Sequence, residues 1–208
     1  MIDIVIPKGN EAEFIEMAEK LGYSELCFAY ASGQAPKLPE SKVKLYRAAI
    51  GKGKADLVIM DTSEPRHAIE KLKPDIICGL ELSSKPDAMY FRNSGLSQVT
   101  AELAARKKVA VGYSFSEILG QRQHMVVGRM MQNIMLCSKY KVTQVIASFA
   151  TDPLQMRNPR DLASLFTVLG MQNPLKALSA ASQIIAKNKE KANPGYAGEG
   201  IKIERKIQ

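Results

Sequence analysis

Three carboxylates are placed where a divalent cation could be bound. Asp61, Glu81 and Asp152 each closely follow a short apolar run that predicts a β-strand. In parallel α/β folds the functional side chains gather at the carboxyl ends of the strands, so these three could hold Mg²⁺ for phosphodiester hydrolysis. Acidic residues after strands also cap helices, and the spacing leaves both interpretations open.

The rest of the sequence carries no recognised catalytic motif. The two histidines, His67 and His124, fall in separate helical patterns and form no metal-binding pair or triad signature. The Gly-Lys-Gly-Lys turn at Gly51–Lys54 lacks the spacing and the following Ser or Thr of a phosphate-binding loop. The three cysteines lie far apart in apolar stretches, which predicts buried free thiols and fits a reducing cytoplasm.

Positive charge is concentrated in one part of the chain. The whole sequence has a net charge of +8, yet residues 1–102 carry 13 Lys and Arg against 15 Asp and Glu, whereas residues 103–160 carry nine against two. A focused basic field favours a polyanion, by attraction and by release of condensed counterions, although a solvated surface is the alternative. The candidate contacts are Arg106, Lys107, Lys108, Arg122, Arg129, Arg157 and Arg160.

The spacing of these cations indicates how they could meet phosphate. Arg122 and Arg129 share a face of a predicted long helix, outside its apolar stripe. Arg157 and Arg160 flank a predicted helix N-terminus, whose free amides attract phosphate, and the planar fork of arginine suits bidentate contact. Arg106–Lys108 close a predicted helix, where cations also complement the helix dipole.

Short apolar runs alternate with helical patterns, which predicts parallel βαβ units. Predicted strands cover residues 2–6, 25–30, 43–50, 56–60, 75–80, 108–115 and 142–149, and the main predicted helices cover 11–21, 64–72, 96–106, 122–140, 159–169 and 175–187. Seven strands without a visible eighth predict an irregular α/β fold, either a barrel or a long open sheet.

Chain organisation adds three expectations. Only Gly51–Lys54 separates the third and fourth strands, so their connection is shortened and has no crossover helix. One domain is predicted over residues 1–187, followed by a basic, flexible tail over 188–208. No apolar run approaches the ~20 residues that a membrane-spanning helix needs, so no membrane association is expected.

Two segments resemble a known family. They are GLSQVTAELAARKKVAVGYSF at Gly95–Phe115 and NPRDLASLFTVLGM at Asn158–Met171, with a Met-rich helix and Lys-Tyr-Lys-Val at Lys139–Val142 between them. This order is similar to that of ribonuclease P protein component 3 of archaea, the relative of the eukaryotic p30-type subunit. The resemblance covers about residues 75–185.

The resemblance implies a TIM-barrel-like fold and a place in the ribonucleoprotein that removes the 5′ leader from precursor tRNA. It implies that the RNA subunit performs the hydrolysis with Mg²⁺, so that the protein needs neither a catalytic site nor a cofactor of its own. Expected partners are ribonuclease P RNA, precursor tRNA within the particle, and protein component 2, in a heterotetramer. Arg160, in the matching Pro-Arg-Asp-Leu motif, is the position first carried over as an RNA contact.

Three functions therefore compete. The leading hypothesis is a noncatalytic RNA-binding subunit in the cytoplasm. The alternative is a free-standing metal-dependent phosphoesterase of related barrel fold, which requires Asp61, Glu81 and Asp152 to converge on one metal ion. The third is a protein–protein scaffold whose basic charge serves only solubility.

Overall fold

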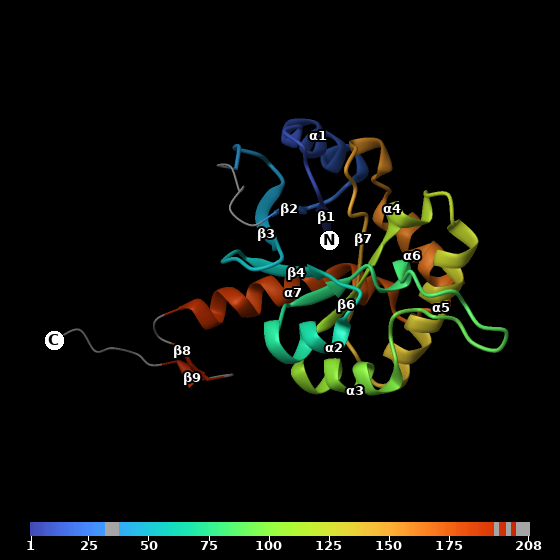
Figure 1. Ribbon diagram of the computed structural model, residues 1–208. Helices are drawn as coiled ribbons and strands as arrows, with labels where there is room; N and C mark the ends of the chain where they lie inside the picture. Colours follow the sequence, from blue (N-terminus) through green and yellow to red (C-terminus); the bar gives the residue numbers. More distant parts are fainter. Residues whose placement is uncertain (32–37, 194–195, 199–200, 203–208) are drawn as a thin grey trace.

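The computed structural model describes residues 1–31, 38–193, 196–198 and 201–202. Seven strands form one parallel sheet and lie beside one another in chain order (Figure 1). Each overlaps a strand predicted from the sequence. They are β1 (Ile2–Val5), β2 (Glu25–Ala31), β3 (Lys44–Ile50), β4 (Leu57–Asp61), β5 (Ile76–Cys78), β6 (Ala110–Ser114) and β7 (Gln144–Ala147).

A narrow seam between the first and last strands closes the sheet into a barrel. The Ile6 amide donates to the Ala150 carbonyl at 2.8 Å, beside a parallel bridge between Val5 and Ala150. Asp3 reinforces the seam, because one carboxylate oxygen accepts the Ser148 amide and the other accepts the Ser148 hydroxyl, both at 2.7 Å. The predicted irregular, TIM-barrel-like α/β fold is confirmed, and the barrel sheet of the described residues has seven strands where a regular TIM barrel has eight.

The shortened connection between β3 and β4 is also confirmed. Residues 51–56 join two parallel strands, a link that normally requires a dozen residues or more. The strand register explains why the connection can be so short. Leu57 at the start of β4 pairs with Ala48, so β4 lies only beside the last three residues of β3. The chain therefore returns over a short distance and needs no crossover helix.

Helices surround the barrel. Side chains from α3, α5 and α6 form one large core with the outward faces of β5 and β6, and Tyr113 of β6 packs on Phe166 of α6 with ring centroids 5.9 Å apart. The helical segments are α1 (Glu11–Leu21), α2 (Pro65–His67), the π-helical η1 (Ala68–Leu72), the 3-10 turns η2 (Leu80–Leu82) and η3 (Pro153–Gln155), α3 (Gln98–Lys107), α4 (Phe115–Ile118), α5 (Gln123–Lys139), α6 (Pro159–Val168) and α7 (Pro174–Ala192).

The last helix, α7, crosses the end of the barrel at which the strands begin (Figure 1). Its buried residues Ala180, Ala181 and Ile185 join the apolar cluster inside the barrel. Asn188 donates to the carbonyl of Asp56 and to the carboxylate of Asp75, which precede β4 and β5. The helix therefore closes this end of the barrel and leaves the opposite end, at which the strands finish, as the open mouth.

The helix α7 extends beyond residue 187, the predicted end of the domain, and its last turns contact the barrel. Asn188 is anchored as described, and Lys189 forms an ion pair with Asp56 at 3.2 Å, so the helix continues to Ala192. A small antiparallel pair follows, formed by β8 (Tyr196–Gly198) and β9 (Ile201–Lys202). The remainder of the predicted tail, 194–195, 199–200 and 203–208, lies outside the described residues.

Candidate nucleic-acid interface

Arg160 lies at the N-terminus of α6, whose local structure agrees with the sequence prediction. Asn158 caps the helix, since its Oδ1 accepts the Arg160 amide at 2.8 Å, and Pro159 occupies the first turn. The Asn158 amide group also donates to the Leu21 carbonyl at 3.0 Å, which ties the cap to the end of α1. The Arg160 side chain is exposed at the carboxyl end of the barrel.

Arg157 precedes this cap and is held more firmly. Its Nη1 donates to the carbonyls of Leu154 and Met156, both at 2.7 Å, and its guanidinium lies 5.2 Å from the ring centroid of Phe115. The group is half-buried. Its Nη2 has no protein partner within the part of the chain that the structure describes, so this nitrogen can still donate to a ligand.

The other exposed candidates lie at two different ends of the barrel. Arg122 follows β6 and directly precedes α5, so it belongs to the carboxyl end with Arg157 and Arg160. Arg106–Lys108 finish α3 just before β6 starts and therefore lie at the opposite end. The predicted set is thus not one patch.

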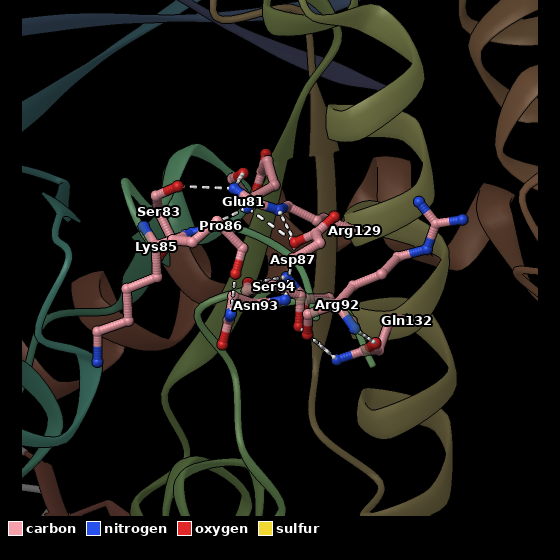
Figure 2. A network of polar contacts seen from close by, with 11 residues as sticks. Glu81, Ser83, Lys85, Pro86, Asp87, Arg92, Asn93, Ser94, Arg129 and Gln132 are labelled. Carbon is pink, nitrogen blue, oxygen red and sulfur yellow. Dashed lines mark hydrogen bonds and ion pairs between the residues drawn. The ribbon is translucent and has the colours of Figure 1, made fainter. Parts of the chain in front are cut away.

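Arg129 is a correction to the sequence analysis. Its side chain is only 2% exposed, and all five of its N–H groups are used within the protein (Figure 2). Nη1 donates to the carbonyls of Glu81 and Ser83, Nη2 donates to the carbonyl of Lys85, and both Nε and Nη2 contact Asp87 Oδ1. The prediction that Arg129 contacts nucleic acid is wrong, because no donor remains for a phosphate.

The reason is that the segment before α3 covers this face of α5. Asn133, one turn beyond Arg129, is fully buried and donates to the Ser94 carbonyl at 2.9 Å. Gln132 accepts the Arg92 amide through its Oε1 and donates to the Arg92 carbonyl through its Nε2 (Figure 2). The helical pattern placed Arg129 outside the apolar stripe, but it could not show that a distant segment packs over this face of the helix.

The three carboxylates of the alternative hypothesis do not assemble into a metal site. Asp61 ends β4, and Glu81 is buried in η2. Asp152 is exposed and caps η3 by accepting the Leu154 amide at 2.8 Å. Within the described ranges, no group of three or more His, Cys, Asp or Glu side chains is arranged to hold a metal ion.

The open mouth of the barrel is instead acidic. Burial, together with the nearby charges of Glu117 and Asp61, raises the pKa of Glu81 to about 7. Burial and the charge of Asp61 likewise raise the pKa of Glu117, a residue that the sequence analysis missed although it follows β6 closely. A Cβ at Gly79, where φ is +72°, would collide with the Asp61 carboxylate, so the glycine allows this close packing. Carboxyl groups thus gather at this mouth, whereas the exposed cations of the predicted set lie outside it.

Fold and charge together define a TIM-barrel-like α/β protein with exposed cations outside an acidic mouth. The model of the family described as RNase P subunit p30 matches residues 54–193. The chain belongs to this family.

Curated relatives agree with this assignment, and solved structures share the fold. Ribonuclease P protein component 3 of Methanosarcina mazei is 28% identical over 95% of this chain and 92% of that protein. A chain in a cryo-EM structure of archaeal ribonuclease P with mature tRNA has a TM-score of 0.79 at 19% identity, with both chains fully covered. Histidinol phosphate phosphatase from Lactococcus lactis, solved with zinc, L-histidinol and phosphate, has a TM-score of 0.58 at 10% identity over 82% of this chain and 94% of that chain, which shows a shared fold alone.

Among the helices of the described residues, none combines the length and the apolar character required to cross a bilayer.

Proposed function

We propose that this chain is a noncatalytic RNA-binding subunit of ribonuclease P that supports removal of the 5′ leader from precursor tRNA by the RNA subunit. Family membership supports the proposal. The observation that carries it is the separation of charge, with the exposed Arg122 and Arg160 and the half-buried Arg157 outside a mouth that holds the buried Glu81.

The proposed role is electrostatic. Folded RNA brings phosphates close together, and cations on a protein surface offset their repulsion while releasing condensed counterions. Exposed arginines suit this role because their planar guanidinium groups donate in pairs to phosphate oxygens. The RNA could then reach its active form at lower Mg²⁺, with the Mg²⁺ used by the RNA and no cofactor bound by this chain.

The proposal includes specific partners. They are ribonuclease P RNA, precursor tRNA within the particle, and ribonuclease P protein component 2, in a heterotetramer. A cytoplasmic location is part of the same proposal and agrees with three free cysteines, Cys27, Cys78 and Cys137, all of them buried.

Salt-dependent binding to the cognate ribonuclease P RNA tests this role. The affinity of the wild-type chain should fall steeply with salt, and each of Arg122→Gln, Arg157→Gln and Arg160→Gln should lower the slope by about one, because each variant removes one cation from the phosphate backbone. Arg66→Gln is the matched control, because Arg66 is exposed but already paired with Glu70 at 3.2 Å. Affinity that does not depend on salt would instead favour a protein–protein scaffold.

A further inference from the structure

The outer surface of α6 and α7 carries a continuous basic trough that the sequence analysis did not identify. Three adjoining hollows form it. The first, beside α6, shares Gln172, Asn173 and Lys176 with the second, and the second shares Lys141, Gln183 and Lys187 with the third. The lining residues place the trough along α6, from the carboxyl end of the barrel, and then along α7. Figure 1 shows the course of these two helices.

Six cations line this trough. They are Arg160, Lys176, Lys141, Lys187, Lys108 and Lys191, in order from the carboxyl end. Asp75 is the one carboxylate among the lining residues described, and its Oδ2 already accepts the Val58 amide at 2.8 Å and the Asn188 amide group at 3.0 Å. The trough is therefore strongly positive.

Four of the trough lysines form no ion pair with any residue that the structure describes. Lys141, Lys176, Lys187 and Lys191 are exposed, and within the described part of the chain none has a carboxylate partner. Lys189 on the same helix shows the contrast, because it lines none of the hollows and pairs with Asp56. Gathering like charges raises the free energy of the folded protein, and a bound polyanion removes this repulsion.

The backbone conformation of two trough lysines is unusual, as is that of Lys73 after η1. Lys108 and Lys141 each follow a helix and adopt left-handed conformations, with φ of 57° and 56°. Glycine normally occupies this position because other residues are strained there, and Gly22 and Gly170 do so after α1 and α6. A helix C-terminus attracts any cation, yet here both side chains also line the trough.

We propose that this trough holds the phosphate backbone of ribonuclease P RNA, with Lys141, Lys176 and Lys187 as its central contacts. The inference rests on the proposed function and deepens it. The stretch of α7 from Lys176 to Lys191 alone is about 22 Å long at the rise of an α-helix, enough to accompany several nucleotides. The amide and hydroxyl groups that share the trough, such as Gln183 and Thr143, can add hydrogen bonds to phosphate or ribose.

Binding of the full chain to the cognate RNA over a range of salt concentrations tests the trough. Lys176→Gln with Lys187→Gln should lower the salt slope by about two, one for each lysine. The charge-matched control is Lys20→Gln with Lys71→Gln, on α1 and η1, which line none of the three hollows. If both double variants keep the wild-type slope while the wild-type chain binds with steep salt dependence, the trough is excluded and the proposed function stands. If wild-type affinity does not depend on salt, the proposed function fails and the trough fails with it.

Lys141→Gly separates a ligand contact from a structural role. Glycine relieves the left-handed backbone strain while removing the charge, so the melting temperature should stay equal or rise while RNA affinity falls. Equal affinity in a stable Lys141→Gly variant would overturn this contact.

A tethered cleavage reagent locates the RNA directly. All three native cysteines are buried, so Lys187→Cys supplies a single reactive thiol for an iron chelate. Radicals from this site should cut a short RNA segment, whereas Lys20→Cys should not cut that segment. Equal cleavage patterns from both sites would contradict the proposal.

Discussion

Arg129 and Asp87 form an ion pair that fastens the helix α5 to the segment preceding α3. Arg129 Nη2 lies 2.8 Å from Asp87 Oδ1, and Nε donates to the same oxygen at 2.9 Å. Nη1 of Arg129 donates hydrogen bonds to the carbonyls of Glu81 and Ser83, and Nη2 also donates to the carbonyl of Lys85 (Figure 2). A residue that resembled a ligand contact thus organises a stretch of irregular backbone.

Replacing this arginine should destabilise the protein. Arg129→Met leaves the carboxylate and three carbonyls without their donors, so the free energy of unfolding should fall by about 3 kcal/mol. Chemical denaturation measures this change, and hydrogen exchange should quicken at the amides of residues 83–97. Arg122→Met is the control, because an exposed arginine should change stability by about 0.5 kcal/mol or less. Equal stability of the two variants would contradict the role of Arg129.

Glu81 should make stability depend on pH. Its carboxylate is 1% exposed and neither oxygen has a hydrogen-bond partner among the described residues, so burial raises its pKa to about 7 from 4.5. The folded state therefore holds this proton more tightly than the unfolded state. The contribution to stability is present below about pH 4.5 and is lost as the pH rises through 7.

Glu81→Gln removes this titration. The difference in unfolding free energy between variant and wild type should grow in favour of the variant between pH 4.5 and 7, by about 2–3 kcal/mol. Denaturant titrations at several pH values give the two curves, with the exposed Glu70→Gln as control. Parallel curves for Glu81→Gln and wild type would show that Glu81 does not titrate abnormally.

The seam of the barrel supplies a third prediction. Ser148→Ala removes the hydroxyl that donates to Asp3 Oδ2, and a buried carboxylate oxygen that loses its donor costs about 1–3 kcal/mol of stability. Burial raises the pKa of Asp3 to about 6 even though Ser148 stabilises the charged form, so the variant should raise it further. Carbon NMR of the Asp3 carboxyl reports the pKa, and Ser164→Ala on the exposed face of α6 is the control. An unchanged Asp3 pKa would contradict the contribution of the hydroxyl.

Local chemistry explains which features could be predicted from the sequence. The start of α6 depends on neighbours in the chain, with Asn158 as cap and Pro159 in the first turn, and it was predicted correctly. The strands were recognisable because their apolar runs are buried within the barrel. The short link at residues 51–56 was visible as a missing helix, although its register was not.

Features that depend on distant contacts could not be predicted. Arg129 is buried because residues 83–97 pack over it, and no local pattern reports that cover. The trough requires Lys141 after α5 to meet Lys187 on α7, which follows only from the way α7 crosses the barrel. Charge along the sequence therefore indicated a polyanion partner, but not the surface that would contact it.

Cleavage of precursor tRNA tests the central claim most directly. The measurement is leader removal by the cognate ribonuclease P RNA at low Mg²⁺, with and without this chain and its proposed partner, protein component 2. Strong stimulation, with no cleavage by the proteins alone, is the predicted result. Cleavage by the purified chain without RNA, abolished by Asp61→Asn or Glu81→Gln, would contradict a noncatalytic role.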